Sequence, residues 1–213
     1  MSKCIIFCAG GFDRLIEPIL DNDWVIAADG GLAHFDRPDV ILGDFDSLGY
    51  VPEGAEVFPV EKDDTDAMLA VRKGLAAGYR DFILYGSLDG PRVDHTVANF
   101  QTLQYLADKD ATGWLVGLSQ MVTVVKNGKI RFPADFTGTV SVFCMGAPAR
   151  GVTIRGLKYS LIDGELTSGF PLGVSNGFVG QEAEISVKDG SLLVILSRQK
   201  AVPRGEGAPE GGG

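Results

Sequence analysis

The sequence is poor in the residues that build disulfide frameworks and histidine-rich metal centres. Its 213 residues include three cysteines and two histidines. An odd, small number of cysteines does not fit a disulfide framework, so we expect Cys4, Cys8 and Cys144 to be reduced core residues. With two histidines, the sequence offers few nitrogen ligands for a zinc site.

The sequence also lacks the patterns of several common classes of protein. No apolar run approaches the length of about 20 residues that spans a bilayer, and no cleavage-site pattern follows the apolar segment near the N-terminus, so we expect a cytoplasmic protein. Neither a Walker A loop nor a GxGxxG fingerprint is present. A net charge of -9 argues against a nucleic-acid partner, because non-specific binding to phosphates needs the opposite sign.

What is present in the first half is an alternation of strand and helix patterns. Apolar runs of strand length end in glycine or aspartate clusters, and two segments carry apolar residues at helical spacing. The expected strands are Lys3 to Ala9, Trp24 to Asp29, Val40 to Asp44, Glu56 to Val60 and Asp81 to Tyr85, and the expected helices are Thr65 to Ala77 and Val93 to Leu106. Such a pattern predicts an α/β fold with a parallel, Rossmann-like sheet in residues 1–120, whose ligand lies at the strand carboxyl ends.

The second half has a different pattern. Short alternating runs predict an all-β sandwich domain in residues 121–200, and Asn127-Gly128 and Asp189-Gly190 are typical of tight hairpins. Residues 201–213 are rich in glycine and proline, so we expect a disordered tail.

The most informative feature is a crowding of aspartates in GDFDS (Gly43 to Ser47) and KDDTD (Lys62 to Asp66). In an extended strand Asp44 and Asp46 would point to the same side, and Asp63 and Asp66 would share one face of the following helix. Clustered carboxylates favour a bound cation, and oxygen ligands beside a phosphate-bearing substrate favour Mg²⁺. The alternative is a structural role, with Asp63 or Asp64 capping the helix.

A second polar constellation is GSLDGPRVDH, from Gly86 to His95. Arg92 offers a planar donor fork for phosphate at a helix start, and its alternative role is an ion pair with Asp94. His95 is interpreted as a structural residue. Asp29, in ADGG, can reach a ribose or a phosphate-bound water, or can serve as a turn residue.

Together, ADGG, GDFDS, KDDTD and GSLDGPRVDH resemble the thiamine pyrophosphokinase family in order and spacing, as does the change to a β-rich second half. The resemblance implies transfer of pyrophosphate from ATP to the hydroxyl of thiamine, and a homodimer with the vitamin at the subunit interface. It implies Asp44, Asp46 and Asp66 as magnesium ligands and, with Arg92 and Asp94, as catalytic residues. It further implies nucleotide contacts from Asp29, Gly30, Ser47, Thr65 and Arg92, and thiamine contacts from Ser175 and Asn176. Asp89, Pro91 and Gly177 depart from the family pattern.

Several points stay open at the level of sequence. The proton acceptor for the hydroxyl is Asp66 or Asp94, and Phe170 or Phe178 covers a ring of the vitamin. One rival function is a magnesium-dependent aspartyl-phosphate phosphatase with Asp44 as nucleophile, since DFDSL resembles the DxDx[TV] signature. Another is a non-catalytic sensor of nucleotide or vitamin.

Overall fold

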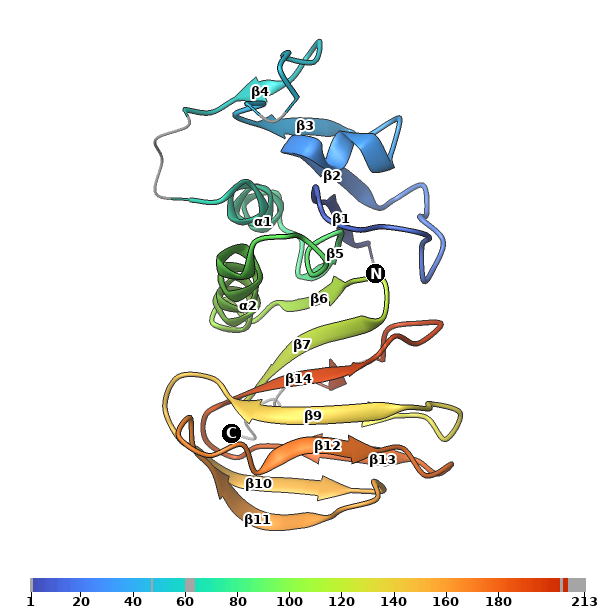
Figure 1. Ribbon diagram of the computed structural model, residues 1–213, viewed down its shortest axis with the longest axis vertical. Coiled ribbons are helices and arrows are strands. Elements are labelled where there is room, and N and C mark those ends of the chain that lie inside the picture. The colour runs from blue at the N-terminus through green and yellow to red at the C-terminus, as the bar shows by residue number, and fades with distance from the viewer. Residues whose placement is uncertain (1, 47, 60–63, 204, 207–213) are drawn as a thin grey trace. The chain divides into compact units, whose positions relative to one another are not determined.

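A computed structural model describes residues 2–46, 48–59, 64–203 and 205–206 (Figure 1). The chain divides into two compact units, Met1–Ser119 and Gln120–Gly213. The fold class predicted from the sequence, an α/β unit followed by an antiparallel β-sandwich, is confirmed.

Unit 1 is built on parallel strands in the order β6-β5-β1-β2-β3-β4. The strands are β1 (Cys4–Phe7), β2 (Trp24–Ala28), β3 (Val40–Gly43), β4 (Glu56–Val57), β5 (Asp81–Tyr85) and β6 (Thr112–Val116). The chain builds the sheet outward from β1 to β4 and then returns to place β5 on the other side of β1. The order therefore reverses between β1 and β5, where open α/β sheets bind their ligands.

Two helices, α1 (Asp66–Ala76) and α2 (Val93–Ala107), lie on one face of this sheet (Figure 1). Their buried residues, such as Ala70 in α1 and Leu103 in α2, face the fully apolar strands. Strands that are buried on both faces have nearly continuous apolar sequences, which explains the sequences of β1 and β5.

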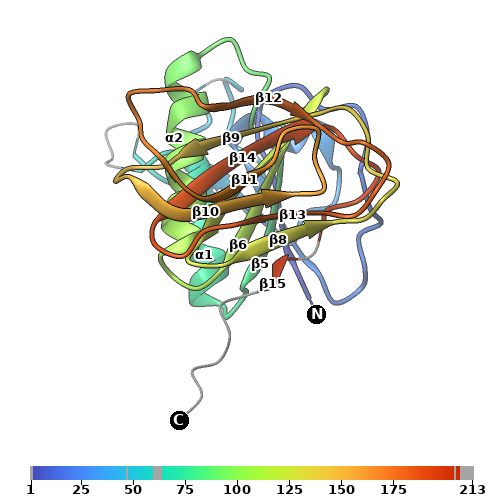
Figure 2. The same ribbon diagram turned by 90° about the horizontal axis from the view of Figure 1, so that it is seen from below.

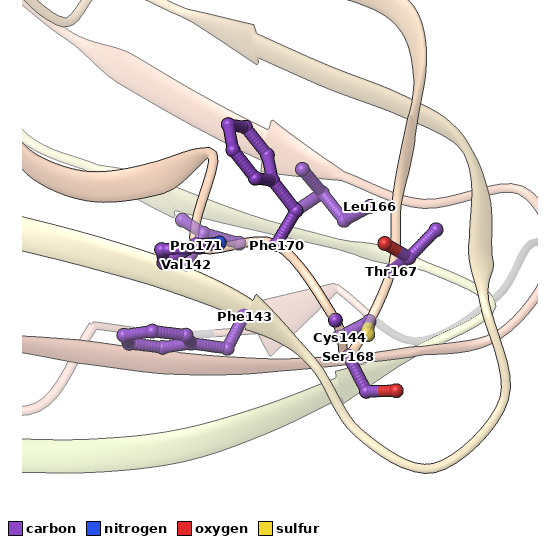
Figure 3. A pocket seen from close by; sticks show the side chains of 9 residues that line it. Val142, Phe143, Cys144, Leu166, Thr167, Ser168, Phe170 and Pro171 are labelled. Atoms are coloured by element: carbon purple, nitrogen blue, oxygen red, sulfur yellow. The ribbon is translucent and has the colours of Figure 1, made fainter.

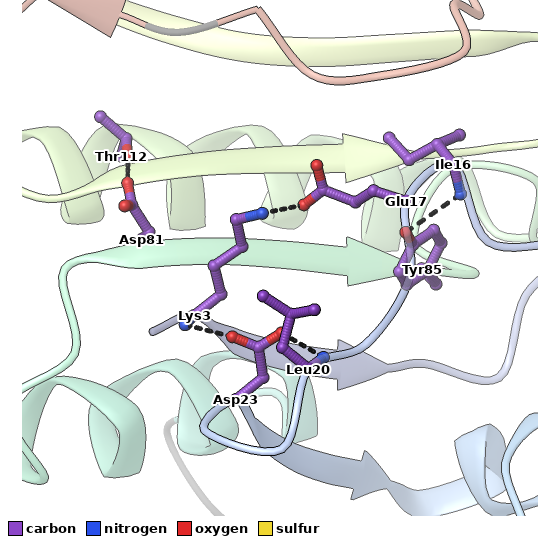
Figure 4. Close-up of polar contacts among 8 residues, drawn as sticks. All are labelled: Lys3, Ile16, Glu17, Leu20, Asp23, Asp81, Tyr85 and Thr112. Atoms are coloured by element: carbon purple, nitrogen blue, oxygen red, sulfur yellow. Dashed lines mark hydrogen bonds and ion pairs between the residues drawn. The ribbon is translucent and has the colours of Figure 1, made fainter. Parts of the chain in front are cut away.

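The connection from β1 to β2 contains no helix, and the sequence pattern predicted none between these two strands. Phe12 from this connection packs edge-on against Phe7 and Tyr85 and covers the sheet face opposite the helices. The Ile16 amide donates to the Tyr85 hydroxyl at 3.3 Å, and Asp23 accepts from the Leu20 amide at 2.9 Å (Figure 4). Side-chain packing and these bonds replace a crossover helix.

Unit 2 consists of two antiparallel sheets (Figure 2). One has the order β12-β9-β14-β7, with β7 (Gln120–Lys126), β9 (Thr139–Cys144), β12 (Gly173–Gly177) and β14 (Ser191–Ser197). The other has the order β11-β10-β13-β8-β15, with β8 (Lys129–Phe132), β10 (Ala149–Arg155), β11 (Leu161–Leu166), β13 (Ala183–Ser186) and β15 (Gly205–Glu206). Buried residues alternate along β9, with Val140 and Val142 inward, as a half-buried strand requires.

The two predicted hairpins are wrong. Asn127 and Gly128 connect β7 to β8, and Asp189 and Gly190 connect β13 to β14, so each turn joins strands of different sheets. The turns bond to each other instead, with the Asn127 amide donating to the Gly190 carbonyl at 3.1 Å and the Gly190 amide donating to Asn127 Oδ1 at 2.8 Å. Both dipeptides supply a positive φ for a corner of the sandwich rather than for a hairpin.

The predicted disordered tail is also wrong in part, because Gly205 and Glu206 form β15 against the edge of β8. Among the described residues, α2 is the longest helix, and none has the length and apolar character that a membrane crossing needs.

Candidate active site

Three carboxylates converge at the carboxyl end of the parallel sheet. One oxygen from each of Asp29, Asp44 and Asp66 lies within 4.8 Å of the other two, and all three residues are half-buried. They come from separate parts of the sequence: Asp29 follows β2, Asp44 follows β3, and Asp66 is the first residue of α1. The fold therefore gathers negative charge at the edge where the sequence places the ligand.

The backbone around Asp29 explains the glycines of ADGG. Asp29 has a φ of 47° and opens a 3-10 helix, η1 (Asp29–His34). A β-carbon on Gly31 would overlap the Phe7 carbonyl oxygen, so only glycine lets η1 lie against the end of β1. The sequence left Asp29 as a contact to ribose or phosphate-bound water or as a turn residue, and the structure places it in the carboxylate cluster with Asp44 and Asp66.

The expected alternation of Asp44 and Asp46 along a strand does not hold. Strand β3 ends at Gly43, and Phe45 adopts a φ of 58° with a buried side chain. This left-handed residue breaks the extended geometry, and Asp46 lies exposed, with its backbone N–H 3.5 Å from Asp44 Oδ1. Asp46 is outside the group of three, and its role as a metal ligand stays a prediction.

Asp66 is positioned by the start of helix α1. Thr65, predicted to bind nucleotide, is the N-cap, and its hydroxyl accepts from the Met68 amide at 3.2 Å. The alternative in which Asp64 caps the helix is wrong, because Thr65 occupies the N-cap position and Asp64 pairs with Arg72 at 2.7 Å. Ser47 and Asp63 lie outside the described residues. The positive end of the helix dipole lies beside Asp66 and favours negative charge there.

Cys8 lies close beneath the cluster. Burial first, and then the negative charge of Asp66, raises the pKa of the Cys8 thiol to about 12. The thiol is therefore neutral near pH 7 and is no nucleophile. Cys4, Cys8 and Cys144 are all free; Cys4 and Cys8 are buried in the core as expected, whereas Cys144 is only partly buried, so its predicted place in the core is wrong.

The cluster has the donor set and the spacing that Mg²⁺ takes. Octahedral coordination at about 2.1 Å places neighbouring oxygens about 3 Å apart and opposite ones about 4.2 Å apart. The three carboxylate oxygens lie within 4.8 Å of one another, a bound close to the longer of these spacings, so small side-chain movements would let them share one ion. The three residues are only half-buried, so an ion held there would be accessible to water or substrate oxygens.

Arg92 and Asp94 form the ion pair that the sequence left as an alternative. Arg92 Nη2 lies 2.6 Å from Asp94 Oδ2 and Nε lies 3.3 Å from Oδ1, and both side chains are exposed. The hydrogen bond from Arg92 holds the pKa of Asp94 below its usual value, and the same bond raises the pKa of Arg92. Asp94 is thereby a weaker proton acceptor than an isolated carboxylate.

In unit 2, the side chain of Asn176 is occupied by the backbone. Its Oδ1 accepts from the Tyr159 amide at 2.9 Å and its Nδ2 donates to the Tyr159 carbonyl at 2.6 Å, in a buried position. Ser175 is exposed with a φ of 59°, and its amide donates to Ser141 Oγ at 3.0 Å. Asn176 thus fixes Tyr159, and only Ser175 presents its side chain to solvent.

A pocket of about 240 Å³ lies in the same unit between β9 and the segment that follows β11 (Figure 3). Its lining combines aromatic, hydroxyl and thiol side chains: Val142, Phe143, Cys144, Leu166, Thr167, Ser168, Gly169, Phe170 and Pro171. Phe170 is 66% exposed and lines this pocket, whereas the half-buried Phe178 packs against the buried rings of Phe132 and Phe136. Of the two aromatics expected to cover a ring, Phe170 has the freedom to do so.

Sequence reasoning missed this pocket. Its walls come from β9 and from residues 166–171, and no motif marks the second segment as a binding element. The one available signal was the solvent-directed Phe170 in a stretch of small and polar residues.

Comparisons with known proteins give the same division of the chain. The family model described as the thiamin pyrophosphokinase catalytic domain matches residues 17–115, and the one described as the thiamin pyrophosphokinase vitamin B1 binding domain matches residues 127–192. The carboxylate cluster falls in the first range and the pocket in the second.

Individual relatives agree along nearly the whole length. A curated thiamine pyrophosphokinase from Bacillus subtilis is 25% identical over 92% of this chain and 99% of its own. A crystal structure of the Geobacillus thermodenitrificans thiamin pyrophosphokinase, 25% identical, matches with a TM-score of 0.74 over 93% of this chain and 98% of the other. The Candida albicans thiamin pyrophosphokinase, 15% identical, shares the fold with a TM-score of 0.73 over 92% of this chain and 89% of its own. The two domain matches, in the order of the two structural units, show that the chain is an enzyme that belongs to the thiamin pyrophosphokinase family.

Proposed function

We propose that the enzyme transfers the pyrophosphoryl group of ATP to the hydroxyl of thiamine, giving thiamine diphosphate and AMP, and that it requires Mg²⁺. In this reaction the thiamine hydroxyl oxygen forms a bond to the β-phosphorus, and the bond from that phosphorus to the α,β-bridging oxygen breaks. The hydroxyl proton leaves to a base, and AMP is the leaving group.

The observation that carries the proposal is the convergence of Asp29, Asp44 and Asp66. Three carboxylates this close repel one another unless a cation or a proton neutralises them. A bound Mg²⁺ neutralises the triphosphate and aligns it for in-line attack. Asp29, Asp44 and Asp66 hold the ion, and exposed Asp46 stays a predicted further oxygen donor beside Asp44.

Arg92 contacts the phosphates without having to leave Asp94. A guanidinium has five N–H donors, and the pair with Asp94 engages Nε and Nη2. The Nη1 group lies outside this pair and is directed by it, because the planar fork is held at two points. Asp94 therefore acts by orienting Arg92.

The proton acceptor is Asp66 rather than Asp94. The pKa of Asp94 is lowered by its bond to Arg92, which weakens it as a base. Asp66 belongs to the carboxylate cluster, so a hydroxyl that approaches the β-phosphorus comes near it. This position favours Asp66, through the carboxylate oxygen that would not hold the ion.

Thiamine binds through unit 2, with Phe170 against one of its rings and Ser175 beside it. The supporting features are the pocket lined by Phe143 and Phe170 and the exposed hydroxyl of Ser175. Aromatic faces suit the flat, partly cationic vitamin. Asn176 contributes indirectly, because it fixes the backbone of Tyr159.

The functional form is a homodimer with the thiamine site at the subunit interface. Large apolar side chains are exposed on unit 2 around β11 and β12: Tyr159, Ile162, Phe170, Leu172, Val174 and Val179. Neighbouring exposed apolar residues are typical of protein interfaces and ligand grooves. Sedimentation at micromolar concentration tests this point, and an active monomer would contradict it.

Isotope tracing decides the reaction. Incubation with thiamine, Mg²⁺ and ATP labelled at either the α- or the γ-phosphate should place the γ-label in thiamine diphosphate and the α-label in AMP. Formation of ADP and thiamine monophosphate would refute pyrophosphoryl transfer. Phosphate released without an acceptor would restore the phosphatase hypothesis, and binding of both substrates without turnover would restore the sensor hypothesis.

A further inference from the structure

Asp89 ties together two loops at the carboxyl end of the parallel sheet. It lies in the loop after β5, and its Oδ2 accepts a hydrogen bond from the Leu118 amide, after β6, at 2.6 Å. The Asp89 side chain also closely approaches Gly117, where a β-carbon would overlap the carboxylate. The two loops are thus joined through one exposed side chain.

The same side chain packs on the loop that follows β1. A β-carbon on Gly11 would lie 3.1 Å from the Asp89 Cβ, and the Gly10 amide donates to the Gly86 carbonyl at 2.8 Å. These contacts lie between β1 and β5, where the strand order reverses. Asp89 therefore stands at the crevice in which an α/β sheet of this kind binds its ligand.

The loop from Gly86 to Arg92 is held on its other side by α2. Asn99 Nδ2 donates to the Ser87 carbonyl at 2.7 Å, and the Ser87 hydroxyl donates to the Leu84 carbonyl at 2.8 Å. Both of these bonds are buried and fix the first residues of the loop. In residues 88–91, the described side-chain hydrogen bond that lies nearest to Arg92 in the sequence is the one made by Asp89.

We propose that Asp89 is a positioning residue, which holds the loop so that Arg92 faces the phosphates of the nucleotide. The inference rests on the proposed function of the enzyme and adds to it a role for Asp89. A bond 2.6 Å long to a backbone amide restricts the loop three residues before Arg92. Such pre-organisation lowers the cost of aligning the phosphoryl group.

Asp89 could act through its hydrogen bond or through its negative charge, and the two roles predict different effects of substituting it. If the bond matters, Asp89→Asn keeps the function, because the amide oxygen accepts from Leu118 and the variant also removes a charge that repels phosphate. If the charge matters, Asp89→Asn and Asp89→Ala behave alike. The pair of variants therefore separates the two roles.

The test compares steady-state kinetics and backbone hydrogen exchange in the full-length protein. Asp89→Ala should lower kcat about tenfold with the KM for thiamine changed less than about twofold, because only the alignment of the phosphates suffers. Asp89→Asn should restore kcat to within about twofold of the wild type. Exchange at Leu118 and in residues 86–92 should rise in Asp89→Ala and stay low in Asp89→Asn.

Asp39 provides the matched control, since it is also exposed and its carboxylate accepts one backbone amide, that of Val25, at 2.8 Å. It lies directly before β3, away from the carboxyl ends of the strands, so Asp39→Ala should leave kcat unchanged. Wild-type kcat in Asp89→Ala, or equal losses in Asp89→Ala and Asp89→Asn, would overturn the proposal. The exchange measurement needs no turnover: if the wild type proves inactive, the proposed reaction fails, while unchanged exchange in Asp89→Ala refutes the loop-holding role separately.

Discussion

The backbone of Gly43 touches Asp29, because a β-carbon on residue 43 would lie 3.0 Å from the Asp29 Cα. This close approach of the ends of β2 and β3 brings the carboxylates of Asp29 and Asp44 together. The glycine of GDFDS is thus a determinant of the carboxylate cluster, although it carries no functional group.

Replacing this glycine should damage both stability and the site. Gly43→Ala places a methyl group against Asp29 at a φ of 153°, which residues with side chains rarely adopt. We expect the unfolding free energy to fall by about 1–3 kcal/mol, which corresponds to a fall in Tm of several degrees. The Mg²⁺-dependent activity should fall by a larger fraction than the stability does. Gly54→Ala is the control: its φ is 75° but no atom lies within 4 Å of the added carbon, so only the stability should fall. Equal activity in the two variants would argue against the role of the contact.

The carboxylates should differ in their effect on binding of the metal-nucleotide complex. Asp29→Asn and Asp44→Asn each remove a charge from the cluster, whereas Asp46→Asn changes an exposed residue outside it. We expect kcat to fall at least about 100-fold in the first two and less in Asp46→Asn. Thermal shift on adding ATP and Mg²⁺ gives a readout without turnover: ligand at 100 times its Kd adds about 2.7 kcal/mol to the wild type, and Asp29→Asn should lose this gain. A full shift in Asp29→Asn would exclude Asp29 as a ligand.

The three thiols should differ in reactivity. Burial raises the pKa of Cys4 to about 12, and Cys8 has a similar value for the reasons given above, whereas Cys144 is only half-buried at the pocket of unit 2. At pH 8 a disulfide reagent should modify Cys144 first, and Cys4 and Cys8 only after denaturation. Rapid modification of all three in the folded protein would contradict the packing around β1.

The same shifts set a dependence of stability on pH. A thiol whose pKa rises from 9.0 to about 12 keeps its proton in the folded state while the unfolded chain loses its own. The folded state then binds more protons than the unfolded state, so stability is retained below pH 9 and falls as the pH rises from about 9 to 12. Urea unfolding across this range should show a smaller fall in a Cys4→Ala, Cys8→Ala double variant.

The sequence was sufficient for the fold class and for the edge of the sheet that carries the site, because both depend on patterns along single strands and helices. The place of Asp46 was not predictable, since a phenylalanine gives no sequence signal for the left-handed conformation that Phe45 adopts. Asn127-Gly128 was correctly recognised as a turn, but the partner strands are set by packing between two sheets. Asn176 shows the same limit, because its bonds to Tyr159 join residues 17 positions apart.

Phe170 and Phe178, which differ in exposure and in what they contact, allow a final test of the thiamine site. Phe170 is 66% exposed at the pocket, so Phe170→Ala should raise the KM for thiamine by about 5- to 30-fold, as the loss of about 1–2 kcal/mol of ring contact implies, with kcat and Tm little changed. Phe178 is half-buried and packs edge-on against both Phe132 and Phe136, so Phe178→Ala should lower the stability by about 2 kcal/mol and leave the KM unchanged below its Tm. Steady-state kinetics with thiamine as the varied substrate, together with thermal unfolding of both variants, separates binding from folding. If Phe170→Ala binds thiamine as the wild type does, the vitamin does not use this pocket, because a ring so exposed has no structural role that could mask the loss of a contact.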